Sequence, residues 1–480
     1  MKTNRVFFVV LIITLLPALA FPASSAPPDL TGIWQGVLKV GGIELRLVIK
    51  VSKTADDQYT ATLDSPDQGA KDIPASLVSF KNGDVKIEIK AIFGVYDGKM
   101  EDDNTITGEW KQGPTTLPLI MKRIDKAPEP PRRPQEPQKP YPYNEEEVVY
   151  DNVKAGIKLT GTLTAPKTDV PFPAVILISG SGPQNRDEAL LGHKPFLVLA
   201  DYLTRQGIAV LRFDDRGVGK STGEFAKATS ADFATDVLAG VEYLKTRKEI
   251  NPKQIGLIGH SEGGLIAPMA ATQSSDVAFI VLLAGPGISG EEILYLQNAL
   301  IARASGAPET AIAKNLTLYK KMFAVIKAEK DNAVAEKKLH PIWTQALTAL
   351  TDEEKKALDF AGASPDSLFQ AQIKQLLSPW FRYFLFYNPQ PTLQKVKCPV
   401  LAINGEKDLQ VPPKENLAAI AKALKAGGNK NFVTKELAGL NHLFQTAQTG
   451  APAEYVKIEE TISPVALQAL GDWILAQAKK

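Results

Sequence analysis

Residues 255–272 read IGLIGHSEGGLIAPMAAT. The run 255–258 is apolar throughout, as a strand buried on both faces of a sheet would be, and a helical pattern begins near Gly264. Between them, Gly259–Gly263 matches G-x-S-x-G, the pattern of a sharp strand-to-helix turn that exposes a serine above a sheet. Glycines are needed there because side chains beside the serine would collide with neighbouring backbone. The stretch therefore predicts a nucleophile at Ser261, and the alternative is an ordinary glycine-rich turn.

A serine nucleophile needs a base, and the chain has four histidines. His193 comes before the serine, and His340 precedes a proline in a helical stretch. His260 lies inside the turn, with its side chain directed away from that of Ser261. Only His442 comes late enough to follow the order nucleophile, acid, histidine that accompanies this turn. We therefore expect His442 to be the base, and the alternative is a loop histidine that caps a helix.

The acid that orients this histidine is expected just after the penultimate strand. The apolar run 400–403 is followed by a turn at Gly405, which places Asp408 in that position. Its carboxylate would hold the His442 ring and stabilise the imidazolium formed during attack. Glu406 is the competing carboxylate, and the alternative for Asp408 is an exposed acid at a strand end.

Negative charge that develops on a substrate oxygen needs fixed hydrogen-bond donors. The backbone N–H of Glu262, the residue after the nucleophile, is one candidate for this oxyanion hole. The other is the N–H of Ser181, in the small-residue loop 179–183 that follows the apolar run 173–178. The alternative for that loop is a purely structural turn.

Residues 214–221 read DDRGVGKS and superficially resemble a phosphate-binding loop. They lack the first glycine of that motif. We therefore expect a structural cluster of ion pairs and turns there, and not a nucleotide site.

From residue 145 onward, strand-like apolar runs alternate with helical patterns, which is typical of a largely parallel sheet. Between Leu283 and Val400 the strand pattern stops, and helical patterns take over, with a capping box at Thr351–Glu354. We expect residues 145–480 to form one α/β domain. Its all-helical insertion, about 286–395, is expected to cap the carboxyl edge of the sheet.

Residues 27–125 are expected to form a small, separate all-β domain. Apolar and polar residues alternate at 44–47 and 85–90, the period of half-buried strands, and glycine-containing turns separate such runs. Short strands at this spacing predict a barrel or a sandwich. We expect Trp34 and Trp110 to pack in its core, and the alternative is a platform for carbohydrate or lipid.

Prolines recur through residues 126–144, which we expect to be a linker between the two domains. Such a run favours an extended, semi-rigid spacer over packed structure. A ligand for proline-reading domains is the alternative.

The first 26 residues are typical of a secretory signal peptide: Lys2 and Arg5 precede the apolar run 6–16, and Ala18–Ala20 fits the cleavage pattern A-x-A. That run is shorter than the roughly 20 residues of a membrane-spanning helix, so no integral span is expected after cleavage. Cys398 is the only cysteine. We expect it to be a buried structural thiol, and neither an intrachain disulfide nor a lipid anchor is expected. These features predict a periplasmic or secreted protein.

Charged residues nearly balance, with 55 Lys and Arg against 53 Asp and Glu. Nucleic-acid-binding proteins usually carry a basic excess or stripe, so no nucleic-acid partner is expected. No histidine or cysteine set has the spacing of metal ligands, and no organic cofactor is implied. The sequence makes no prediction of oligomeric state.

Taken together, the loop 179–183, residues 214–221, the turn 259–263 and the pair Asn441-His442 identify a resemblance. From about residue 145 to 480, the chain resembles the serine-aminopeptidase-like and lysophospholipase-like α/β hydrolases. Among them it is similar to exported bacterial esterases that carry an N-terminal β domain. The resemblance implies an α/β-hydrolase fold with a helical cap and acyl-transfer chemistry. In that group a histidine usually precedes the glycine of the oxyanion loop, whereas Ser179 stands there in this chain, so only the backbone donor is carried over.

We expect the chain to hydrolyse a small-molecule carboxylic ester through an acyl-enzyme on Ser261. Peptide or amide hydrolysis is the first alternative, because the same triad serves both reactions. The second is a glycan- or lipid-binding envelope protein with an inactive hydrolase fold. A serine-reactive fluorophosphonate probe would separate the enzymes from the binding protein.

Overall fold

The computed structural model describes residues 29–40, 43–113, 115–168, 171–358, 360 and 364–478. The expected signal peptide, residues 1–26, lies outside these ranges. Within them, no helix combines the length and the apolar composition that a membrane span needs.

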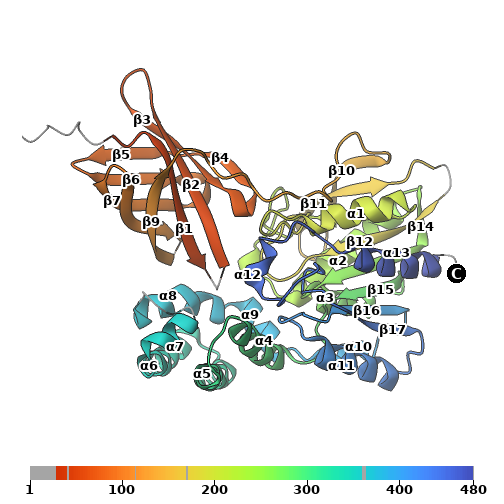
Figure 1. Ribbon diagram of the computed structural model, residues 1–480. Helices are drawn as coiled ribbons and strands as arrows, with labels where there is room; N and C mark the ends of the chain where they lie inside the picture. The colour runs from red at the N-terminus through yellow and green to blue at the C-terminus, as the bar shows by residue number, and fades with distance from the viewer. Residues whose placement is uncertain are drawn as a thin grey trace, which may run out of the picture.

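The N-terminal part is one curled antiparallel sheet of nine strands (Figure 1). Its strands are β1 (Gly32–Val40), β2 (Ile43–Lys53), β3 (Tyr59–Ser65), β4 (Ala70–Pro74), β5 (Leu77–Lys81), β6 (Asp84–Ile89), β7 (Gly94–Asp102), β8 (Thr105–Gln112) and β9 (Thr115–Ile124). Their order is β4-β3-β2-β1-β9-β8-β7-β6-β5. A single curled sheet is closer to the predicted barrel than to a sandwich of two sheets. Trp34 and Trp110 are 1% and 3% exposed, so both pack in the core as predicted.

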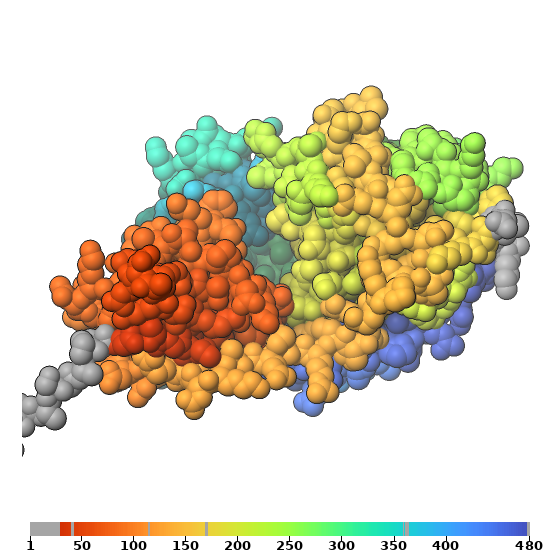
Figure 2. All heavy atoms as spheres, turned by 90° about the horizontal axis from the view of Figure 1, so that it is seen from above, coloured from red at the N-terminus to blue at the C-terminus, as the bar shows by residue number. Residues whose placement is uncertain are grey.

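The proline-rich stretch, residues 126–143, forms no helix or strand, and it also makes hydrogen bonds to the α/β domain. The Arg133 guanidinium donates hydrogen bonds to the carbonyls of Leu191, Val456 and Ile458. The Gln135 side chain bonds both Thr461 and Ile462. Figure 2 shows this segment, in orange, running along the surface from one domain to the other. Proline spacing predicts an extended backbone, but it carries no information on the surface against which that backbone lies.

The second part is an eight-stranded sheet with the order β10-β11-β13-β12-β14-β15-β16-β17. The strands are β10 (Asn144–Asn152), β11 (Ile157–Ala165), β12 (Phe172–Ile178), β13 (Ala209–Phe213), β14 (Ile250–His260), β15 (Val277–Leu283), β16 (Val400–Gly405) and β17 (Phe432–Leu437). β10 and β11 run antiparallel to their neighbours, and the other pairs are parallel. β10 begins at Asn144, the residue that the prediction gave to the end of the linker.

Helices cover both faces of this sheet. α2 (Ser230–Lys245), α3 (Gly263–Ala271) and α11 (Pro413–Ala426) pack on one face, and α1 (Pro195–Arg205) and α13 (Pro464–Ala478) pack on the other. Successive side chains of a strand point to opposite faces. Accordingly, Val175 and Leu177 of β12 belong to one core, and Ala174, Ile176 and Ile178 belong to the other. Burial on both faces explains why the central strands read as continuous apolar runs.

Helices α4–α10 lie between β15 and β16 in the chain. They are α4 (Gly290–Ala304), α5 (Glu309–Ala328), α6 (Asn332–Thr348), α7 (Asp352–Ala357), α8 (Pro365–Leu376), α9 (Pro379–Phe386) and α10 (Gln390–Leu393). The first six form a layer with a core of its own around Phe323 and Trp343. Figure 1 places this helical layer beside the sheet and below the β domain. The predicted fold class, an α/β-hydrolase fold with a helical insertion behind a small β domain, is confirmed.

Candidate active site

Ser261 stands on a strained turn between β14 and α3. Its backbone has φ +52°, in the left-handed region that side chains rarely adopt. The Ser261 N–H donates to the carbonyl of Leu283, at the end of the neighbouring β15, over 2.8 Å. A Cβ on Gly259 would lie 1.9 Å from the Gly263 carbonyl oxygen, and one on Gly263 would lie 2.2 Å from that of Ile178. Both glycines are therefore sterically required for the turn.

Asp408 and His442 form a buried hydrogen-bonded pair. His442 Nδ1 lies 2.9 Å from Asp408 Oδ2, and the two residues are 3% and 1% exposed. The other carboxylate oxygen, Oδ1, accepts from the backbone N–H groups of Gln410 and Val411 at 2.9 and 2.8 Å. Because an ionised carboxylate only accepts, Nδ1 carries the proton, and His442 Nε2 is left as the basic nitrogen.

The loops after β16 and β17 touch each other, which brings this pair together. A Cβ on Gly405 would lie 2.2 Å from the Leu440 carbonyl oxygen, so the close approach depends on glycine. Asn441 holds the histidine loop by accepting from the N–H groups of Leu443 and Gln445. Glu406, the competing carboxylate, accepts instead from the exposed Gly439 N–H.

The loop of His442 lies directly beside the serine turn. The rings of His260 and His442 are 4.9 Å apart between centroids, and His260 Nε2 lies 3.1 Å from the His442 carbonyl oxygen. Ser261 follows β14, Asp408 follows β16 and His442 follows β17, so all three occupy the carboxyl edge of one parallel sheet. This is the edge at which parallel α/β sheets place their ligands.

The loop after β12 lies on the other side of the serine. A Cβ on Gly180 would be 3.3 Å from Ser261 Cβ, so this backbone passes close to Ser261. The Gly180 N–H donates to Glu188 Oε1 over 2.7 Å, so it is already engaged. The next N–H along the loop is that of Ser181, an exposed residue, and the Glu262 N–H lies at the start of α3. The two predicted oxyanion donors thus come from the loop and from the helix that flank Ser261.

Two acids near this loop, Glu188 and Asp215, received no role of their own from the sequence. Glu188 bonds His260 Nδ1 at 2.9 Å as well as Gly180. Asp215 accepts from Ser179 Oγ and from the Gln184 N–H, both at 2.9 Å. Burial raises the pKa of the Asp215 carboxyl to about 8. Asp215 lay within a motif that the sequence singled out, whereas nothing in the pattern around Glu188 distinguishes it from a surface acid.

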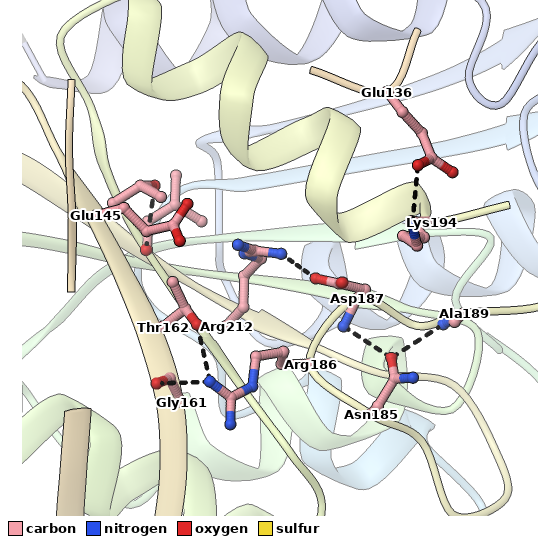
Figure 3. Close-up of polar contacts among 12 residues, drawn as sticks. Glu136, Glu145, Gly161, Thr162, Asn185, Arg186, Asp187, Ala189, Lys194 and Arg212 are labelled. Atoms are coloured by element: carbon pink, nitrogen blue, oxygen red, sulfur yellow. Dashed lines mark hydrogen bonds and ion pairs between the residues drawn. The ribbon is translucent and has the colours of Figure 1, made fainter. Parts of the chain in front are cut away.

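The loop that carries Glu188 is fixed by charged contacts (Figure 3). Arg212 of β13 pairs with Asp187, and Lys194 pairs with Glu136 of the proline-rich stretch. Arg186 reaches back to the Gly161 carbonyl and the Thr162 hydroxyl of β11.

The motif at residues 214–221 provides further ion pairs, as the sequence predicted. Asp214 pairs with Arg186 at 2.7 Å, and Arg216 pairs with Asp236 of α2 at 2.8 Å. The Ser221 hydroxyl donates to the Asp214 carbonyl, which closes the turn.

Glu262 connects the serine turn to the helical layer. Its side chain is buried, and Oε1 accepts from the hydroxyl of Ser230 at 2.5 Å and from Trp380 Nε1 at 2.8 Å. Trp380 belongs to α9 and also stacks on Phe384. Burial raises the pKa of the Glu262 carboxyl above its usual value. An aromatic residue of the helical layer therefore makes a polar contact with the residue next to Ser261.

A family model described as serine aminopeptidase, S33, matches residues 194–360. The chain is 26% identical to esterase EstD of Thermotoga maritima over 305 residues, which are 62% of this chain and 61% of EstD. The match thus spans about three fifths of that relative's length. An uncharacterized 31.7 kDa protein of Escherichia coli is 25% identical over 277 residues, or 56% of this chain and 85% of that protein.

Solved structures of α/β hydrolases are also similar. The α/β hydrolase GrgF from Penicillium sp. sh18 has a TM-score of 0.44 and 17% identity, over 70% of this chain and 100% of its own. The esterase Pf2001 of Pyrococcus furiosus has a TM-score of 0.41 and 18% identity, over 70% of this chain and 91% of its own.

Proposed function

We propose that this chain, which belongs to the α/β hydrolases and resembles their esterases, hydrolyses carboxylic esters through an acyl-enzyme on Ser261. The observation that carries the proposal is the buried Asp408–His442 pair at 2.9 Å, in a loop that lies directly beside the Ser261 turn. A serine raised on a strained turn, next to a histidine whose tautomer is fixed by an acid, is an arrangement suited to nucleophilic acyl transfer.

In the first half of the reaction, His442 Nε2 takes the proton of the Ser261 hydroxyl as its oxygen attacks the ester carbonyl. Asp408 stabilises the imidazolium that results. The N–H groups of Ser181 and Glu262 are the donors for the oxyanion of the tetrahedral intermediate. His442 then protonates the departing alcohol, which leaves an acyl group on Ser261.

In the second half, a water molecule enters in place of the alcohol. His442 accepts its proton as the oxygen attacks the acyl carbon, and the acid product leaves when the Ser261 oxygen recovers that proton. The same groups therefore serve both halves, and the residues of the site suffice for each proton transfer.

The test is turnover of p-nitrophenyl acetate, butyrate and octanoate by the purified chain without residues 1–26. Ser261→Ala and His442→Ala are each expected to lower kcat by roughly three or more orders of magnitude, because triad members act as a unit. His340→Ala is the matched control. His340 lies in the helical insertion, where it pairs with Asp366, and this variant is expected to keep full activity. The ratio of the three ester rates also measures the size of the acyl pocket.

Labelling by a fluorophosphonate separates the remaining possibilities. If the folded wild type is labelled at Ser261 but cleaves none of the esters, the substrate would instead be a peptide or an amide. If the folded wild type is neither labelled nor active, the proposal that the chain is an enzyme would be overturned, and a binding function would be favoured.

We also propose that the chain is exported to the periplasm or beyond, on the strength of residues 1–26. Expression of the full chain in a Gram-negative host is expected to yield a shortened protein in the periplasmic or external fraction. Full-length mass in the cytoplasmic fraction would contradict export.

A further inference from the structure

His260 stands between two hydrogen-bond acceptors, and this determines where its protons are. Its Nε2 lies 3.1 Å from the His442 carbonyl oxygen, and its Nδ1 lies 2.9 Å from Glu188 Oε1. A carbonyl oxygen cannot donate, so Nε2 must carry a hydrogen. With Nε2–H alone, the lone pair of Nδ1 would face an acceptor oxygen. Both contacts are satisfied at once when both ring nitrogens carry hydrogen, that is, when His260 is an imidazolium.

His193 offers an internal comparison, because it is also buried but differently surrounded. Its Nε2 faces both the Tyr455 carbonyl and the Gln445 amide nitrogen, whereas its Nδ1 faces the hydroxyl of Thr461. Because the hydroxyl can donate or accept and the amide can donate to Nε2, no contact requires a second proton on this ring. Burial, joined by the charge of Arg133, lowers the pKa of His193 to about 4. The partners of His260 thus favour a proton on both ring nitrogens, whereas those of His193 do not.

We propose that Glu188 and His260 form a buried carboxylate–imidazolium pair that positions the oxyanion loop and the catalytic histidine loop around Ser261. The inference rests on the proposed function, because it assigns positioning roles within the same site. Glu188 holds the Gly180 N–H, the group just before the Ser181 donor. His260 holds the backbone of His442 and directly precedes the nucleophile. One ion pair thus connects all three loops that must converge on the substrate carbonyl.

The surroundings are consistent with a positive charge on this ring. Burial alone would lower the pKa of His260, but the charge and hydrogen bond of Glu188, together with the His442 carbonyl and the charge of Asp408, raise it above its usual value. The ionisable groups that face the ring are Glu188, Asp408 and the His442 ring, and Glu188 in turn lies near the Asp215 carboxyl. A buried carboxylate without a cation would be costly, so the imidazolium also stabilises Glu188.

The first test reads the charge directly and needs no substrate. Ring-15N-labelled histidine in the wild-type chain gives signals from few residues, since the sequence contains four histidines. At about pH 8, above the ordinary histidine pKa of about 6.5, His260 is expected to show two protonated ring nitrogens and His193 one. His260→Gln and His193→Gln assign the signals. A neutral His260 ring at that pH would overturn the proposal.

The second test reads positioning. Glu188→Gln and His260→Gln are each expected to lower kcat for p-nitrophenyl butyrate roughly 10- to 100-fold, because misplaced reacting groups cost about this much. KM is expected to change less than about threefold. The double variant is expected to lose no more than the worse single variant, as for residues that act as one unit.

His193→Gln is the matched control, because it also removes a buried, hydrogen-bonded imidazole. It is expected to lower the melting temperature and to keep kcat within about threefold. The positioning role would be overturned if His193→Gln and His260→Gln lost equal activity, or if the losses in the double variant were additive. Either result would show that the Glu188–His260 contact has only a general structural role. A charged His260 in a wild type that turns over no ester would instead count against the proposed function alone.

Discussion

At the scale of single residues, the orientation of His442 depends on one carboxylate. Both Asp408 oxygens are engaged, one by His442 Nδ1 and one by two backbone N–H groups. In Asp408→Asn, the amide must turn its oxygen either to the backbone donors or to the histidine. The backbone pair favours the oxygen, so the NH₂ group would face Nδ1 and stabilise the wrong tautomer.

We therefore expect Asp408→Asn to fold normally and to lose about 10³- to 10⁴-fold in kcat. Glu406→Gln is the control, since Glu406 bonds only the exposed Gly439 N–H, and it should keep wild-type kcat. Steady-state kinetics with p-nitrophenyl butyrate, with circular dichroism as a check on folding, measures both. The opposite ranking would assign the acid to Glu406.

The proposed oxyanion donor at residue 181 is a backbone group, so its loss requires a change to the backbone. Ser181→Ala keeps the N–H and is expected to change kcat less than about threefold. Ser181→Pro removes the N–H and is expected to lower kcat about 10²- to 10³-fold, the usual effect of deleting one oxyanion donor. If these two variants had comparable rates, the oxyanion donor would have to be another group of the loop.

Ser261 and Asp408 could be proposed from the sequence because each comes soon after a buried apolar strand, and His442 because of its late place in the chain. All three follow parallel strands, whose carboxyl ends meet at one edge of the sheet. Glu188 could not be selected in this way. It lies 72 residues from His260 in the chain, in an irregular loop, and no periodic pattern records which loop folds over the turn.

At the scale of elements too, some features could be predicted from the sequence pattern and others could not. Strand runs and the helical insertion are visible because burial imposes a period on the sequence. The contact between Trp380 of α9 and Glu262 is not visible, because it depends on how the helical layer sits on the sheet. The sequence around Trp380 contains nothing that identifies Glu262 as its partner.

The loop after β12 depends on a buried acid whose ionisation should appear in the stability of the protein. Burial raises the pKa of the Asp215 carboxyl to about 8, whereas an unfolded chain has a value near 3.9. Between these values the native state holds a proton that the unfolded state has released. The free energy of unfolding therefore falls as pH rises toward 8, by at most about 1.4 kcal/mol per pH unit from this group, and levels off above it.

Asp215→Asn mimics the protonated acid. Its NH₂ can donate to Ser179 Oγ, and its oxygen can accept from the Gln184 N–H. We expect the variant to gain stability relative to wild type as pH rises from about 5 to 8, as measured by urea unfolding across that range. A stability difference that stays constant with pH would show that Asp215 is ionised in the native state throughout.

At the scale of the whole molecule, the β domain is joined to the catalytic loops by more than a covalent linker. Ile43 and Leu45 of β2 pack against Leu191 and Leu443. They also pack against Tyr455, the last residue of α12 (Pro452–Tyr455), and against Val456, which follows it. Leu443 directly follows His442. Figure 1 shows the ends of β1 and β2 reaching toward α12 between the two domains. A small domain without any predicted site residue thus contacts the loop that carries His442, the proposed base.

This contact predicts that the β domain supports activity through the position of His442. Leu45→Asp would place a carboxylate in the apolar cluster, at a cost of about 1–3 kcal/mol if the domains stay docked. Part of the population should therefore undock, which frees the loop at Leu443. We expect a several-fold lower kcat, with KM for p-nitrophenyl acetate changed less, and a β domain that melts separately in calorimetry.

Leu77→Asp is the matched control. Leu77 lies on β5 with 43% of its surface exposed, and it is not part of the cluster between the domains. The same charge there should leave kcat and the melting profile close to wild type. If Leu45→Asp behaved like Leu77→Asp, the β domain would have no effect on turnover through this contact. Its function would then lie away from the proposed active site. If only Leu45→Asp slows turnover, the N-terminal domain contributes to the active site, because it stabilises the position of the loop that carries His442.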